Sequence, residues 1–132
     1  MRRNAKDRIA KSGVSIVYIF GSKAVGRGSS LSDVDIGVVL KDSVLYKDAR
    51  SVYQSLFEIF SDLYPKSKVD IVFLQAAPIP LQYAATKEGR LLFEADPRTT
   101  VEYENRVVNE YLDFKPTLDY FDEIATTRYG KA

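Results

Sequence analysis

The clearest chemical signal in this 132-residue sequence comes from two aspartates and a glycine–serine pair. Gly21 and Ser22 follow an apolar run, and after ten intervening residues Asp33 and Asp35 come at the start of a second apolar run. Because alternate residues of a strand point the same way, Asp33 and Asp35 are expected on one face. Two neighbouring carboxylates repel each other unless a cation lies between them. Since Mg²⁺ prefers carboxylates together with substrate phosphates, the pair predicts a magnesium site.

Asp70 is the natural third member of this site. It lies within the apolar run Val69 to Phe73, where a lone carboxylate is costly to bury unless it is paired or binds a metal. An ion pair with Lys68 or with a distant arginine is the alternative explanation. The position of Asp70 on a later strand could bring it beside Asp33 and Asp35.

The Gly21-Ser22 pair has the features of a phosphate-binding turn. Glycine lets the backbone approach a phosphate, and successive N–H groups at the start of a helix bind anions. The hydroxyl of Ser22 can add a donor, and Lys23 or Arg27 can add positive charge. Each of these features alone is common in ordinary turns and loops. A phosphate-binding turn that faces three carboxylates is what metal-assisted phosphoryl or nucleotidyl transfer requires.

The composition narrows the possible chemistry. The sequence contains no cysteine and no histidine, which excludes Ser-His-Asp and cysteine nucleophiles as well as thiolate or imidazole metal sites. Any catalysis must therefore rely on carboxylates, hydroxyls, backbone amides and a bound hard cation.

Charge is distributed unevenly although the formal net charge is only +1. Residues 1–30 carry seven basic side chains and one acidic one, a net +6, whereas residues 94–123 carry three basic and nine acidic ones, a net −6. Solvated helix faces are a sufficient explanation, so we do not expect direct nucleic-acid binding. No apolar run approaches the ~20 residues of a membrane span, and the start lacks the apolar core of a secretory signal. The expected location is the cytoplasm.

Hydrophobic periodicity predicts strands that alternate with helices, and hence one α/β domain over residues 1–132. We expect a two-layer α+β arrangement, with a mixed sheet of about four strands and helices packed on it. On the second strand, Val34, Ile36, Val38 and Leu40 should share one face. The predicted strands are 14–20, 33–40, 68–74 and 90–95; the predicted helices are 2–12, 45–63, 78–87 and a tail from Pro97 that Pro116 breaks or kinks before a last segment, 117–128.

The segments Ile19-Phe20-Gly21-Ser22 and Ser32-Asp33-Val34-Asp35-Ile36 together resemble the signature of the minimal nucleotidyltransferases. These form the MNT branch of the polymerase-beta-like nucleotidyltransferase superfamily. Asp70, within Val69-Asp70-Ile71-Val72, fits the third acid on a later strand of that family. The resemblance covers nearly the whole chain, because further segments also look like MNT proteins, namely residues 78–81, 88–94 and 110–116.

The resemblance implies the nucleotidyltransferase fold and Mg²⁺-dependent transfer of AMP from ATP to a hydroxyl. Asp33 and Asp35 would hold the metal, with two ions during catalysis, and Asp70 would complete the site and help to deprotonate the acceptor. Gly21 and Ser22 would hold the triphosphate.

Many MNT proteins are antitoxins that silence a HEPN-family ribonuclease toxin by adenylylating one of its tyrosines, so the resemblance also implies a HEPN-type partner. One position departs from the family, which often has arginine where this chain has Val25. Either Arg27 replaces that charge or the triphosphate is held more weakly.

The size of the chain bears on the acceptor. A module of ~130 residues has few residues left to enclose an acceptor pocket after it has formed a nucleotide cleft. This favours a docked macromolecule as the acceptor over a small molecule. Aromatic residues, which are enriched at protein interfaces, crowd the acidic tail: Tyr103, Tyr111, Phe114, Tyr120, Phe121 and Tyr129. Core packing is the competing explanation for them, with Leu118, Phe121 and Ala125 at helical spacing.

Three functions therefore remain open. The chain can be a protein adenylyltransferase that acts as an antitoxin, or a nucleotidyltransferase for a small hydroxylated acceptor such as an aminoglycoside. That second function usually needs an added domain or a homo-oligomer to complete the pocket. The third is a non-catalytic module that neutralises its partner by contact alone.

Overall fold

The computed structural model describes residues 1–21, 33–42 and 49–129. Its element bounds agree with the predicted ones to within one or two residues wherever both are described. Residues 45–48, the predicted start of the second helix, lie outside the described ranges. The elements are α1 (Arg3–Lys11), β1 (Val14–Phe20), β2 (Val34–Leu40), α3 (Ala49–Leu63), β3 (Val69–Phe73), the short 3₁₀ helix η1 (Leu74–Ala76), α4 (Ile79–Glu88), β4 (Arg90–Glu94) and α5 (Pro97–Tyr129).

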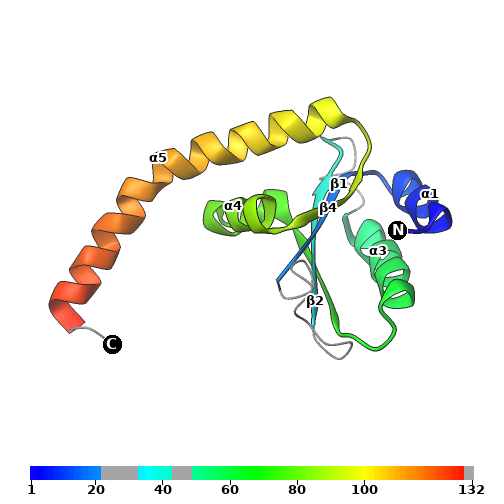
Figure 1. Ribbon diagram of the computed structural model, residues 1–132, viewed down its shortest axis with the longest axis horizontal. Coiled ribbons are helices and arrows are strands. Elements are labelled where there is room, and N and C mark those ends of the chain that lie inside the picture. Colours follow the sequence, from blue (N-terminus) through cyan, green and yellow to red (C-terminus); the bar gives the residue numbers. More distant parts are fainter. Residues whose placement is uncertain (22–32, 43–48, 130–132) are drawn as a thin grey trace.

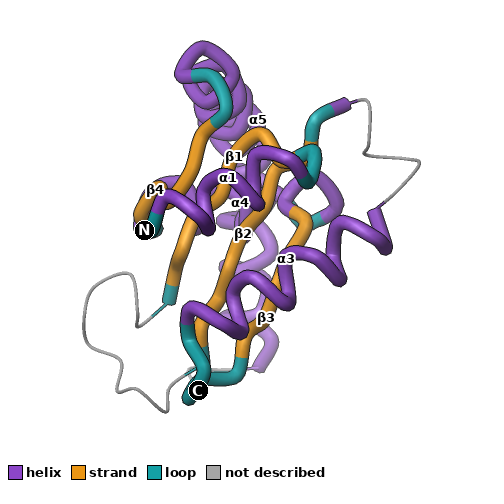
Figure 2. Tube along the Cα trace, turned by 90° about the vertical axis from the view of Figure 1, so that its right-hand side faces the viewer, coloured by secondary structure: helices purple, strands orange, loops and turns teal. Residues whose placement is uncertain are grey.

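The four strands form one mixed sheet in the order β3-β2-β1-β4. β1 is antiparallel to both β2 and β4, whereas β2 and β3 are parallel. Figure 2 shows the sheet between α1 and α3 in front and α4 behind. The mixed four-stranded sheet that the sequence predicts is therefore confirmed, and the parallel β2–β3 pair places the start of one strand beside the start of the other.

Helices cover both faces of this sheet, which makes three layers where two were expected. On one face, α1 and α3 pack over Val34, Ile36, Val38 and Leu40, the set predicted to share a face. On the other face, α4 and the first half of α5 pack over residues that include Ile16 and Tyr18. The third layer forms because β1 is apolar on both sides, so a second helical layer is needed to bury its other face.

The end of β2 is joined to η1 by the side chain of Gln75, which hydrogen-bonds to the backbone of Leu40 as a neighbouring strand would. The amide of Gln75 accepts from the Leu40 N–H at 2.9 Å and donates to the Leu40 carbonyl at 2.7 Å. Nearby, Gly37 leaves room for Leu74, whose Cδ1 would be 3.0 Å from a Cβ at that position. These contacts hold β3 in register with β2.

The helix α5 runs without a break through Pro116, so of the two outcomes predicted there, a break or a kink, the break is not observed. Proline removes one N–H and crowds the preceding turn, and such residues bend a helix without always ending it. Figure 1 shows that α5 changes direction in its second half and extends beyond α4. Within the described residues, no helix combines the length and the hydropathy needed to cross a membrane.

Candidate active site

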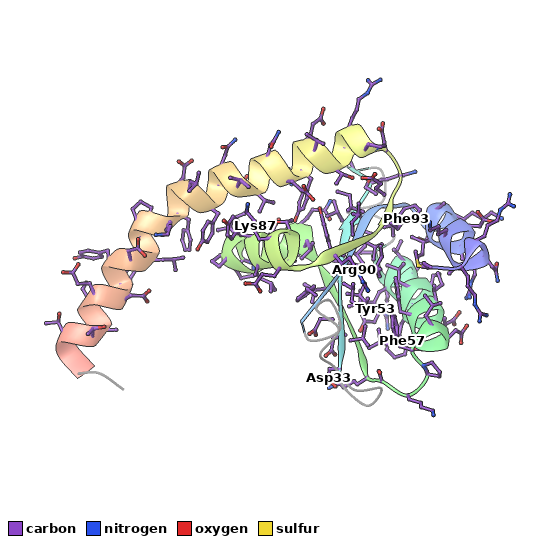
Figure 3. All side chains as sticks on the ribbon, in the orientation of Figure 1. Asp33, Tyr53, Phe57, Lys87, Arg90 and Phe93 are labelled. Carbon is purple, nitrogen blue, oxygen red and sulfur yellow. The ribbon has the colours of Figure 1, made fainter. Side chains whose placement is uncertain are left out.

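Two of the three candidate acids are brought together by the parallel pairing of β2 and β3. Asp35 and Asp70 are direct register partners, so their side chains lie next to each other on one face of the sheet. Asp33 comes two residues before Asp35 and is exposed at the start of β2, where Figure 3 shows it. The three acids therefore follow one edge of the sheet, on the face that α4 and α5 also cover.

Asp35 is affected by its burial and by the other two acids. Burial is the largest effect that raises the pKa of Asp35 above its usual 3.8, and the negative charges of Asp70 and then Asp33 raise it further. Within the described ranges, the ion pairs involve other residues, so the alternative in which Asp70 pairs with Lys68 is not observed. Asp35 is therefore a carboxylate that would gain from a nearby cation.

The donor set suits a hard divalent cation by its chemistry, since all three candidates are carboxylates. The three carboxylates are farther apart than the ligands of a complete metal site. In the parts of the chain that the structure describes, no three acidic side chains surround a common point closely enough to hold an ion. Mg²⁺ commonly takes only one or two carboxylates and completes its shell with water and substrate phosphates, which an open pair such as Asp35 and Asp70 allows.

Gly21 lies directly against this acidic group. Phe20 is the register partner of Asp35, and Gly21 follows it with a φ of +80°, a conformation that favours glycine. A Cβ at position 21 would stand 2.6 Å from Oδ2 of Asp35. The turn after β1 therefore lies directly against the carboxylate, and a larger residue there would have to adopt a strained φ and displace the end of the Asp35 side chain.

The remaining predicted phosphate ligands lie outside the described residues, namely Ser22, Lys23 and Arg27, together with the departure at Val25. The structure adds one cation that the sequence suggests only as an ion-pair partner. Lys68 is exposed, and its carbonyl accepts from the Val34 N–H at 2.8 Å. Because Lys68 comes two residues before Asp70, strand alternation places both on the same side of the sheet. This two-residue spacing is the feature of the sequence from which the position of Lys68 could have been predicted.

A cavity of about 1130 Å³ lies at the opposite end of the sheet from the acids. Its lining includes Ser15 at the start of β1 and Leu40 at the end of β2, but none of the three candidate acids. The polar chemistry predicted from the sequence is therefore at the open edge beside Gly21, and this cavity does not contribute to it.

A family model described as polymerase beta, nucleotidyltransferase, matches residues 4–98. This segment contains β1 to β4 and all three acids, so the chain belongs to the polymerase beta nucleotidyltransferase family. No curated protein is similar enough in sequence to count as a match.

Solved structures share the fold over almost the full length. A chain from a toxin–antitoxin crystal structure with AMP-PNP is 20% identical, with a TM-score of 0.69 over 94% of this chain and 98% of that one. A chain from the complex of a tri-AMPylated Shewanella oneidensis HEPN toxin with its MNT antitoxin is 21% identical, with a TM-score of 0.63 over the same shares. A chain of the MntA–HepT toxin–antitoxin structure is 21% identical, with a TM-score of 0.62 over 93% of this chain and 98% of that one.

Proposed function

We propose that this protein transfers AMP from ATP to a hydroxyl of a protein partner, most specifically a tyrosine of a HEPN-type toxin, and thereby acts as an antitoxin. The observation that carries the proposal is the direct pairing of Asp35 with Asp70 beside the left-handed Gly21 turn. An acidic pair next to a glycine that lets the backbone come close is suited to a nucleoside triphosphate whose charge a cation neutralises.

The reaction is an in-line displacement at the α-phosphorus of ATP. A bond forms between the acceptor oxygen and the α-phosphorus, the bond to the bridging oxygen breaks, and pyrophosphate leaves with the electron pair. Asp70 takes the proton of the acceptor hydroxyl, while the backbone at Gly21 and the Ser22 hydroxyl orient the triphosphate. Asp33, Asp35 and Asp70 would hold Mg²⁺, which would supply positive charge to stabilise the attacking and leaving oxygens.

The proposal of a protein acceptor draws on the comparisons. Relatives with this fold come from toxin–antitoxin complexes, one with AMP-PNP and one with an AMPylated HEPN toxin. A small hydroxylated acceptor, such as an aminoglycoside, is the second candidate reaction. A non-catalytic antitoxin, which neutralises its partner by contact alone, is the third candidate.

The test first identifies a HEPN-domain protein encoded beside the gene for this chain, and then incubates the two purified proteins with α-labelled ATP. With Mg²⁺ we expect label on a partner tyrosine, located by mass spectrometry, and none with EDTA or with Asp35→Asn. Asp62→Asn is the matched control. Asp62 is an exposed aspartate on α3, 3.6 Å from Arg8, and its substitution should leave labelling unchanged.

Each other outcome identifies a different function. A partner that is silenced but carries no label supports the non-catalytic antitoxin and overturns the proposal. Label on aminoglycosides, with none on the partner, supports the small-molecule reaction instead.

A further inference from the structure

The first half of α5 buries one continuous side of the helix against the body of the protein. Thr100, Tyr103 and Val107 are buried there. The Tyr103 hydroxyl donates to Oε1 of Gln82 on α4 at 2.8 Å. One turn further along, Tyr111 stacks face to face on Tyr83 of α4, with ring centroids 3.9 Å apart. This side of α5 is therefore a packing surface as far as residue 111.

The same side continues beyond α4 as an apolar stripe. Its members follow Tyr111 at alternating steps of three and four residues, and are Phe114, Leu118, Phe121 and Ala125. Because each residue turns an α-helix by about 100°, they stay in line with Val107 and Tyr111. Phe114 is 37% exposed and Phe121 is 62% exposed. Ala125 is exposed as well and Leu118 is half-buried, so none of the three residues considered for the core belongs to it.

We call residues 112–127 the arm. Figure 3 shows the arm extending past α4 as a helix that no other described element covers, with side chains on all sides. Pro116 lies on the side opposite the stripe, where the missing N–H opens the helix, so the arm bends toward the stripe. Figure 1 shows this bend on the α4 side. An isolated helix of this length is only marginally stable in water. Its apolar side would therefore be stabilised by packing against another surface.

The spacing and the charge of the arm restrict what can cover it. Steps of three and four residues are the pattern by which two helices pack at a shallow angle, so the occupant is a helix placed in line with α4. Residues 110–127 carry five acids and one base, a net −4, and the base, Lys115, is 3.1 Å from Asp119. Two such arms would repel each other, which disfavours a second copy of this chain.

We propose that the arm docks a helix of a protein partner whose own apolar stripe is flanked by lysines and arginines. The inference rests on the proposed function for the identity of that partner, the HEPN-type toxin. The arm extends on the α4 and α5 side of the sheet, the face that also carries Asp35 and Asp70. A partner held by the arm therefore lies on the face where its hydroxyl must arrive.

The experiment compares two double variants in binding to the same purified HEPN-domain partner that the AMP-transfer test uses. Phe114→Ala with Phe121→Ala removes two rings of the stripe. Val101→Ala with Leu112→Ala is the matched control, because both residues are apolar, 57% exposed and on the other side of α5. We expect the stripe variant to weaken binding at least about 100-fold and the control less than about threefold, since each 1.4 kcal/mol is tenfold in affinity.

Two further measurements separate the possible results. Circular dichroism should show that both variants keep their helix content, and raised salt should weaken wild-type binding because the flanking charges are complementary. Unchanged binding by the stripe variant, or an equal loss by the control, overturns the proposal. So does a wild-type dimer in light scattering that the stripe variant dissociates. Binding through the arm without AMP transfer would instead refute the proposed reaction and leave the docking surface standing.

Discussion

Gly21 meets two separate requirements, and each can be tested at the level of the residue. An alanine there would have to adopt the left-handed φ of +80°, and its Cβ would stand 2.6 Å from Oδ2 of Asp35. The strain costs about 1–2 kcal/mol, while the contact displaces the carboxylate. We expect Gly21→Ala to fold but to lose AMP transfer at least about 100-fold, measured with labelled ATP.

Gly13→Ala is the control for this prediction. Gly13 has a φ of +89° at the other end of β1, far from the acids. It carries the same backbone strain, so it should lower the melting temperature similarly and keep transfer. An equal loss of transfer in both variants would mean that reduced stability, and not the contact with Asp35, is responsible.

Asp35 should be needed for transfer but unfavourable for folding. Burial and the charges of Asp70 and Asp33 raise its pKa in the folded protein, so above that pKa the folded state retains an ionised group that it disfavours. In metal-free buffer at pH 7 we expect Asp35→Asn to melt at the same or a slightly higher temperature than wild type. Near pH 3 the carboxyl is protonated in both states, and the difference should shrink. A large loss of stability at pH 7 would show that Asp35 is structural.

At the scale of the elements, the register of β2 and β3 depends on Gln75. Its amide serves both backbone groups of Leu40, and each hydrogen bond contributes about 1 kcal/mol. We expect Gln75→Ala to lower the free energy of unfolding by about 1–3 kcal/mol in urea denaturation. Gln75→Glu should be no better, because a carboxylate cannot donate to the Leu40 carbonyl. Gln54→Ala, exposed on α3, should change little.

The strands could be predicted because their signal is local. Val14 to Phe20 is β-branched or aromatic at every position except Ser15, and the alternation of Val34 with Asp35 gave the correct faces of β2. The pairing of Asp35 with Asp70 could be suggested but not fixed, because register depends on contacts between distant segments such as Gln75 and Leu40. The same limit applies to the third layer, which exists through contacts such as Tyr83 with Tyr111. The sequence at Pro116 left a break and a kink both open, because proline removes one N–H whether the helix ends or only bends, and α5 is continuous and bent.

At the scale of the whole molecule, the stability of α5 should fall steeply along its length. Amide hydrogens exchange slowly where buried contacts hold a helix and quickly where few do. Residues 103–111 pack on α4 and β1, whereas Phe121 is 62% exposed. In the free protein we therefore expect amides of residues 103–111 to exchange at least about 100-fold more slowly than those of 117–127, measured by mass spectrometry. Uniform slow exchange along α5, unchanged on dilution, would mean that the arm is stable without a partner, and the need for a covering helix would disappear.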